Sequence, residues 1–261
     1  MFRKIRIIIL LFVLFLVGAN SYLTHRRITD WDQPLSIVIY PINADDSPFT
    51  ADYITSLTRV DFKSIAHFMQ SEGMRYKLSL VDPVVLDVAP EISILPPVPP
   101  LETNIFAIIW WSLQFRYWAW KHDTYDGPFA SIQVFVLYYD PNTHSQLDHS
   151  LGLQEGHICL VKAFASRYQA VRNNVVIAHE MLHTLGATDK YNLQTLQPIY
   201  PEGYAHPEQN PLLPQKFAEI MGRAIPLSAS ESDMPDSLSF TVIGPQTARE
   251  IKWLKKGSSL D

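Results

Sequence analysis

The spacing of two histidines most constrains how this chain can fold. His179 and His183 lie four residues apart and follow the apolar run Val175-Val176-Ile177-Ala178. On a helix of about 3.6 residues per turn, positions four apart lie one above the other, so both imidazoles share one face. The apolar run indicates that much of the remaining helix surface is buried. We therefore expect a packed helix over residues 171–185 that presents two neighbouring imidazoles.

Two imidazoles on one helical face are typical of a zinc site. Zinc accepts imidazole nitrogen, and a catalytic zinc keeps three protein ligands and leaves one position for water. Glu180, directly after the first histidine, is placed to accept a proton from that water as a general base. We therefore predict His179 and His183 as ligands of Zn²⁺ and Glu180 as the catalytic residue.

The residues after this helix suggest the third ligand. Gly186 stands where the helix should end, because glycine readily adopts the left-handed backbone that terminates many helices. Asp189 follows three residues later and can return a carboxylate to the same ion. Other side chains in the following loop remain alternatives for the third ligand: Glu202, His206 and Glu208.

The run from His179 to Asp189, His-Glu-Met-Leu-His-Thr-Leu-Gly-Ala-Thr-Asp, resembles the extended zinc signature of the metzincin-like zincin metallopeptidases. The commonest form of that signature has histidine as the third ligand. Aspartate at this place is similar to the snapalysin-like variant. The resemblance covers roughly residues 171–223. It implies that Met221 is the methionine of the family's Met-turn, a hydrophobic floor beneath the ion.

The same resemblance implies an activity and an architecture. A zincin hydrolyses peptide bonds of a peptide or protein substrate, and Glu180 passes a proton from water to the leaving nitrogen. Its cleft lies between an upper part with a sheet and a lower, loop-rich part. A tyrosine could stabilise the oxyanion, and Tyr204 is the first candidate beside Tyr191 and Tyr200. The alternative function is a metal-binding but non-catalytic zincin-fold envelope protein that acts as a binding module.

The order of apolar patterns predicts an α+β fold, with a mixed sheet packed on the helix that carries the histidines. A segment with six prolines, residues 82–100, should be a loop. The aromatic helix at 104–122 is interrupted by Arg116 and Lys121, which favours a core helix over a membrane segment. The predicted strands are 35–40, 76–81, 131–139 and 156–164, and the predicted helices are 61–72, 104–122, 171–185 and 248–254.

The N-terminal sequence predicts export. Arg3, Lys4 and Arg6 precede residues 7–19, which contain no charged side chain. This pattern is typical of a signal peptide, with cleavage after Ala19, or of a membrane anchor. We expect residues 1–29 to be that segment and residues 30–261 to be the peptidase domain. The domain would then be anchored facing the outside or periplasm, or secreted.

Composition excludes one class of partner. The net charge is −5 and the isoelectric point about 6.0, whereas a nucleic-acid-binding surface is basic. Cys159 is the single cysteine, so no intrachain disulfide can form. Its apolar neighbours predict a small buried side chain rather than a reactive thiol.

Overall fold

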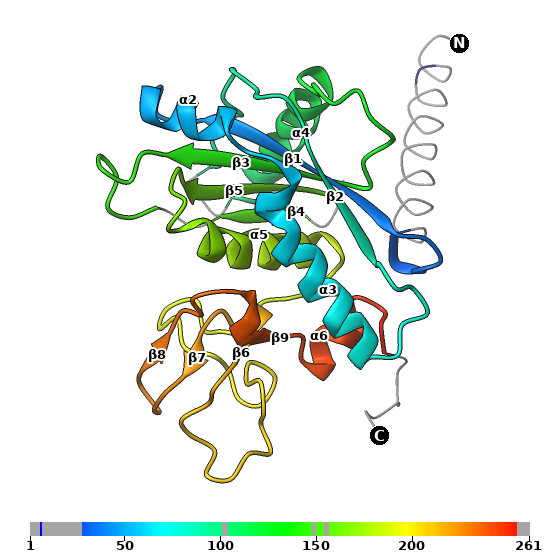
Figure 1. The fold of residues 1–261 in the computed structure, drawn as a ribbon, viewed down its shortest axis with the longest axis vertical. Coiled ribbons are helices and arrows are strands. Elements are labelled where there is room, and N and C mark those ends of the chain that lie inside the picture. Colours follow the sequence, from blue (N-terminus) through cyan, green and yellow to red (C-terminus); the bar gives the residue numbers. More distant parts are fainter. Residues whose placement is uncertain (1–5, 7–27, 101–103, 148–149, 154–156, 255–261) are drawn as a thin grey trace.

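The computed structural model of the chain describes residue 6 and residues 28–100, 104–147, 150–153 and 157–254. Its centre is a five-stranded sheet in the order β2-β1-β3-β5-β4 (Figure 1). Four strands run parallel, and β4 pairs antiparallel with β5 at one edge. The strands are β1 (Leu35–Asn43), β2 (Val84–Val88), β3 (Ile132–Tyr139), β4 (Leu151–Leu153) and β5 (Ile158–Phe164).

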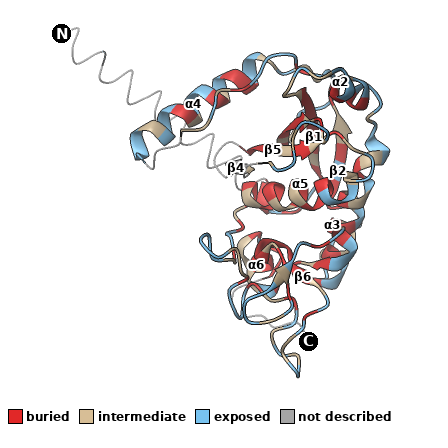
Figure 2. Cartoon of the chain, turned by 90° about the vertical axis from the view of Figure 1, so that its left-hand side faces the viewer, coloured by how far each residue is buried: buried red, intermediate tan, exposed pale blue. Residues whose placement is uncertain are grey.

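The central strands are buried on both faces, which explains their nearly continuous apolar sequences. One face is covered by three helices, α2 (Pro48–Thr55), α3 (Lys63–Arg75) and α5 (Ala170–Thr184), with the short helix η1 (Arg59–Phe62) between the first two. The other face is covered by α4 (Ile105–Lys121). Figure 2 shows buried residues concentrated where these helices meet the sheet. The fold is therefore mixed α/β with a mainly parallel central sheet.

The C-terminal part, residues 185–254, lies beyond α5 and has little regular structure (Figure 1). Its strands are two residues long and pair as β6 with β9 and β7 with β8. Its elements are β6 (Ala218–Glu219), η2 (Ile220–Gly222), β7 (Ile225–Pro226), β8 (Ser232–Asp233), η3 (Leu238–Phe240), β9 (Thr241–Val242) and α6 (Pro245–Glu250).

One buried carboxylate joins segments of the C-terminal part. Glu219 is fully buried, and its two oxygens accept from Gly222 N at 2.8 Å, Gly244 N at 2.9 Å and Thr247 Oγ1 at 2.6 Å. A side chain at Gly244 would place a Cβ 2.8 Å from Glu219 Cγ, so the close approach requires glycine. Glu219 thereby connects η2 to the start of α6.

Most predicted elements are present with shifted ends, but the strand predicted at 76–81 is wrong. The helix before it continues through Gly73 to Arg75 and closes at Lys77, which has a φ of 58°. The amide of Leu78 then donates to Gly73 O at 2.9 Å, so this segment is tied to the helix rather than to a strand. The strand is β2 instead, inside the region that the prolines predicted to be loop.

Two predicted helices also differ. The C-terminal helix occupies 245–250 instead of 248–254, because Trp253 N donates back to Ala248 O and ends it. The helix predicted at 104–122 is present as α4, yet it is a core helix along one face only. Its buried residues are Trp111, Phe115, Trp118 and Ala119. The remaining side chains of α4 are partly or fully exposed.

The folded part includes residues just before the predicted domain start at 30. Ile28 and Trp31 are buried, and Trp31 Nε1 donates to Ile251 O at 2.7 Å. Among the described residues, no helix is both long and apolar enough to span a membrane. The predicted signal or anchor at 7–19 lies outside the described residues. Cys159 is buried and unpaired, as predicted.

Candidate metal centre

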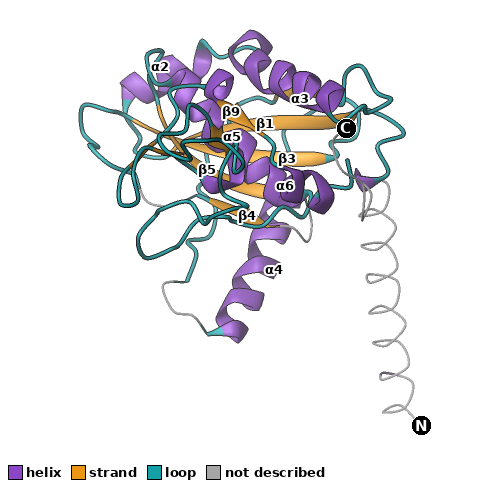
Figure 3. Ribbon diagram, turned by 90° about the horizontal axis from the view of Figure 1, so that it is seen from below, coloured by secondary structure: helices purple, strands orange, loops and turns teal. Residues whose placement is uncertain are grey.

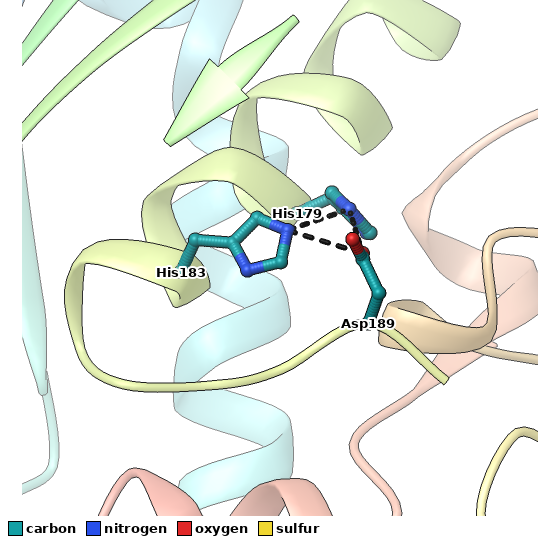
Figure 4. Close-up of side chains that lie close together, drawn as sticks. All are labelled: His179, His183 and Asp189. Carbon is teal, nitrogen blue, oxygen red and sulfur yellow. Dashed lines mark hydrogen bonds and ion pairs between the residues drawn. The ribbon is translucent and has the colours of Figure 1, made fainter. Parts of the chain in front are cut away.

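Three ligand atoms converge at the C-terminal end of α5 and in the loop after it (Figure 4). The Nε2 atoms of His179 and His183 lie 3.2 Å apart. Asp189 Oδ1 lies 3.2 Å from the Nε2 atom of His179 and 3.1 Å from that of His183. The three atoms form a nearly equilateral triangle, and within the described ranges these residues form the group suited to holding a metal ion.

Hydrogen bonds on the far side of each imidazole fix which nitrogen carries a proton. His179 Nδ1 lies 2.9 Å from Ile220 O, and His183 Nδ1 lies 2.8 Å from Ala187 O. A carbonyl oxygen can only accept, so both Nδ1 atoms donate. In a neutral imidazole the other nitrogen then has a lone pair. Both Nε2 lone pairs therefore point toward Asp189, as in metal-binding histidines held by a carbonyl.

The triangle has the dimensions that zinc requires. Ligand atoms about 2.0–2.1 Å from a tetrahedral ion lie about 3.3 Å from one another. The observed separations of 3.1–3.2 Å agree with that value to within about 0.2 Å. Two nitrogen lone pairs and a carboxylate oxygen at such distances repel one another unless a cation lies between them. The donor set of two imidazoles and one carboxylate also fits a catalytic zinc.

The electrostatics of the three side chains also favour a cation. Burial acts to raise the pKa of Asp189, but its hydrogen bonds to His179 and His183 outweigh burial and hold that pKa well below its usual range. Burial acts to lower the pKa of His179, but the Asp189 carboxylate, which accepts a hydrogen bond from the ring once Nε2 is protonated, and the charge of Glu180 outweigh burial and raise that pKa. The carboxylate therefore stays ionised and attracts positive charge to this point.

The loop that carries Asp189 is held by α6. Gly186 has a φ of 102°, the left-handed conformation that turns the chain back after the helix. Thr188 donates its amide and its hydroxyl to the two carboxylate oxygens of Glu250, at 3.0 and 2.9 Å. Lys190 Nζ donates to Glu250 Oε2 at 2.7 Å. The residues on both sides of Asp189 are thus fastened to the same side chain.

The turn that carries Met221 is tied to the ligands through its backbone. The carbonyl of Ile220 accepts from His179, and the carbonyl of Met221 accepts from Lys190 N at 2.8 Å. Met221 is fully buried in the same apolar cluster as the core of α5. Glu219 holds this turn in place through its hydrogen bond with Gly222. The turn therefore positions one ligand directly and the loop of another through Lys190.

A pocket of about 690 Å³ opens beside the three ligand atoms. Glu180 lines it and is buried, so the predicted base and the predicted ligands share one cavity. Tyr191 also lines the pocket, with its ring 6.3 Å from that of His179. Arg223 lies over the Tyr191 ring, with Cζ 5.9 Å from the centroid. The pocket therefore combines a proton acceptor, a phenol and a cation around the ligand triangle.

The other sequence candidates lie elsewhere. Glu202, His206 and Glu208 are exposed and do not belong to the ligand group, which leaves Asp189 as the third member. Tyr204 does not line the pocket; its ring packs against Tyr200 at 5.4 Å. The tyrosine at the pocket is Tyr191.

Three other histidines, which are not among the predicted ligands, are separate from the triangle. His157 is buried and bonds through Nδ1 to Thr184 O at 3.2 Å, which is a structural role. His144 lies 3.6 Å from Asp45, and His149 is outside the described residues.

Sequence reasoning missed the groups that position the ligands. Glu250 and Lys190 are 60 residues apart, and their pairing leaves no local pattern. The carbonyl of Ile220 is a backbone group, which no side-chain motif encodes. Tyr191, which follows Asp189 by two residues, was among the tyrosines that the sequence offered as candidates. No known family profile matches the chain, and no curated protein is similar to it in sequence.

Proposed function

We propose that this protein is a zinc-dependent peptidase with a zincin-like active site. One observation carries the proposal: the two imidazole lone pairs and the Asp189 carboxylate converge at zinc spacing, and Glu180 lines the same pocket. The extended motif from His179 to Asp189 supports the same conclusion, because it resembles the signature of that family. We propose His179, His183 and Asp189 as the ligands of Zn²⁺.

Zinc bound by these side chains would supply a Lewis acid that activates water and polarises a carbonyl oxygen. Glu180 accepts the proton of the attacking water and donates it to the amide nitrogen that leaves. Asp189 adds negative charge to the ligand set, and Ile220 and Ala187 keep both histidines in the neutral tautomer that binds metal. Tyr191 is the phenol placed to donate to the oxyanion.

The edge of the sheet beside the pocket favours a peptide substrate over a small molecule. β4 lies at the edge of the sheet, next to β5, and residues of both the sheet and α5 line the pocket. An extended polypeptide can pair with such an edge through its backbone. We propose that the substrate binds along this edge, with its scissile bond at the ligand triangle. The export predicted from residues 1–29 would place such a peptidase outside the cytoplasm.

Metal content tests the ligand assignment. Full-length protein purified in a mild detergent should contain one zinc per chain by mass spectrometry. His183→Ala and Asp189→Ala should lose it or bind it much more weakly, since each removes one of three ligands. His206→Ala is the matched control, because it removes an exposed histidine that is the alternative ligand. A folded wild-type protein that takes up no zinc after incubation with the metal would refute the proposal.

Glu180→Gln separates catalysis from metal binding. The variant should retain zinc and lose hydrolysis of a denatured protein substrate by about 10²–10⁴-fold, the usual contribution of a general base. Glu202→Gln, which neutralises an exposed glutamate, should leave both properties unchanged. A wild-type protein that binds zinc and cleaves none of a broad peptide library would instead favour the non-catalytic binding module.

A further inference from the structure

The helix α4 divides into two halves that meet different surroundings. Its C-terminal half packs on the sheet through Phe115 and Trp118, whose rings lie 5.7 and 5.2 Å from Phe135 of β3. Its N-terminal half extends beyond the sheet, away from the body of the protein (Figures 2 and 3). The first six residues, Ile105 to Trp110, have no polar side chain, and five of them are exposed. This end of the helix is apolar around its whole circumference.

Exposure along α4 is too extensive for an ordinary protein surface. Phe106 is 78% exposed and Trp120 is 74% exposed, at opposite ends of the helix. A contiguous apolar patch of this kind usually marks an interaction site. The exposed large apolar side chains of α4 are Ile105, Phe106, Ile108, Ile109, Trp110, Leu113, Tyr117 and Trp120.

We propose that the N-terminal half of α4 inserts end-on among the acyl chains of an anionic bilayer. Aromatic side chains such as Trp110, Tyr117 and Trp120 are the types enriched where a bilayer meets water. The charged side chains of α4 are Arg116 and Lys121, and both are positive in a protein of net charge −5. Lys121 is exposed and suits anionic headgroups, whereas Arg116 is partly exposed and its Nε atom is buried. The apolar end of the helix suits the acyl region.

The shape of the exposed region favours a bilayer over a protein partner. A second copy or another folded protein that packed against one side of this helix end would leave the opposite side in water. Acyl chains surround a projecting helix end on all sides, as the apolar circumference of residues 105–110 requires. The apolar run at residues 7–19 with its basic flank independently indicates that this chain meets a membrane.

This inference does not depend on the metal centre. The triangle lies at the end of α5, on one face of the sheet, and α4 packs on the other face through a separate apolar cluster. A protein without peptidase activity would therefore keep the same membrane helix, and the two proposals can fail separately.

Site-specific fluorescence in the full-length protein tests the proposal. Cys159 is fully buried, so an introduced cysteine can be labelled selectively with an environment-sensitive dye. The probe sites are Phe106→Cys and Leu113→Cys, and the control is Ser230→Cys, an exposed position in the C-terminal part. All three positions are exposed, so the variants should fold, which circular dichroism verifies. Each is reconstituted into phosphatidylcholine vesicles containing phosphatidylglycerol.

Dye at position 106 should show blue-shifted emission and at least twofold quenching by lipids that carry a nitroxide on the acyl chain. Dye at position 230 should show neither, and dye at 113 should be quenched more by headgroup nitroxide. The lipid identity is tested by omitting phosphatidylglycerol, which should reduce quenching at 106. Position 106 behaving like position 230 would overturn the proposal. Self-quenching at 106 without nitroxide quenching would also overturn it, because it would identify a second copy as the partner.

Discussion

The strands β1, β3 and β5 pair along most of their length and have an apolar cluster on each face, whereas residues 185–254 contain strands of only two residues. The C-terminal part relies on single polar side chains instead. Glu219 satisfies three donors from two segments, and Glu250 satisfies Thr188 and Lys190. Stability in the sheet is distributed over many similar contacts, and in the C-terminal part it is concentrated in a few carboxylates.

This difference bears on the proposed metal centre, because its residues come from both parts. His179 and His183 come from a helix packed on the sheet, and Asp189 comes from the loop held by Glu250. Under the proposed function, the rigid part would supply two ligands and the base, while the polar network would supply the third ligand. Substitutions in the two parts should then differ in both the size and the kind of their effects.

The largest effect is expected for Glu219→Ala. Removing this carboxylate leaves Gly222 N, Gly244 N and Thr247 Oγ1 buried without their acceptor. Each such group costs about 1–3 kcal/mol, and relief from burying the carboxylate offsets part of their sum, so the free energy of unfolding should fall by about 3–5 kcal/mol. Urea unfolding at neutral pH measures it, with the exposed Glu202→Ala as control. A loss of unfolding free energy no greater than in the control would show that the C-terminal part does not depend on this carboxylate for its stability.

Glu250→Gln should lower the free energy of unfolding by about 2–3 kcal/mol at neutral pH, because it leaves the buried Lys190 ammonium without its charge partner. Burial acts to raise the pKa of Glu250, but Lys190 and Thr188 outweigh it and lower that pKa. Its stabilisation is therefore complete above the ordinary glutamate pKa of about 4.5 and is lost as pH falls through the lowered value.

The difference between wild type and Glu250→Gln should accordingly shrink in unfolding experiments below about pH 4.5. Glu208→Gln, which neutralises an exposed glutamate, controls for the change in net charge. A difference that stays constant down to pH 3 would show that the ion pair with Lys190 is not the source of the stabilisation.

The same Glu250→Gln variant should weaken zinc binding by about tenfold. This is a typical effect of removing a group whose hydrogen bonds fix the position of a metal ligand. Thr188 and Lys190 would lose their common acceptor, and Asp189 between them would lose its fixed position. Competition with a fluorescent chelator measures the affinity. Equal affinities in the variant and the wild type would show that the C-terminal part does not position the third ligand.

A core substitution in the sheet should have a smaller effect on stability and none on the metal. Ile39 is fully buried in β1, and Ile39→Val removes one methylene at a cost of about 1 kcal/mol. Val85→Ala, at a half-exposed position on β2, is the control. A change in zinc affinity in Ile39→Val would mean that the sheet and the metal centre are coupled through packing.

The smallest effect is expected for Asp236→Asn, which removes the ion pair between Arg172 of α5 and the C-terminal part. Both side chains are more than half exposed, so water and salt screen the pair. The free energy of unfolding should change by at most about 0.5 kcal/mol. A larger loss, measured at low and at high salt, would show that surface charges contribute to holding the two parts together.

The comparison also explains what the sequence could predict. The β-branched runs of β1 and β3 report burial directly, and the four-residue spacing of His179 and His183 reports a shared helix face. The approach of Asp189 to the two histidines was predictable because a glycine-ended helix returns the chain within a few residues. These features depend on neighbours in the sequence.

Other features depend on residues that are far apart. Glu219 accepts a hydrogen bond from Gly244, which is 25 residues away in the sequence, and no periodic pattern of residues predicts such a contact. The two faces of α4 could not be distinguished either, because its apolar residues occupy all sides and periodicity then carries no information. Residues 84–88, rather than 76–81, form a strand because they pair with β1, which is also distant in the sequence.

The sheet between α4 and α5 would act as a spacer. Layers of packed secondary structure lie about 10 Å apart, so the ligand triangle would lie roughly 20 Å from the axis of a bilayer-bound α4. An extended chain covers about 3.3 Å per residue. A substrate rooted in the same bilayer would then need an unfolded juxtamembrane tether of at least about six residues to reach the pocket. Membrane proteins with shorter tethers would not be cleaved, whatever their sequence at the cleavage point, because they could not reach the pocket.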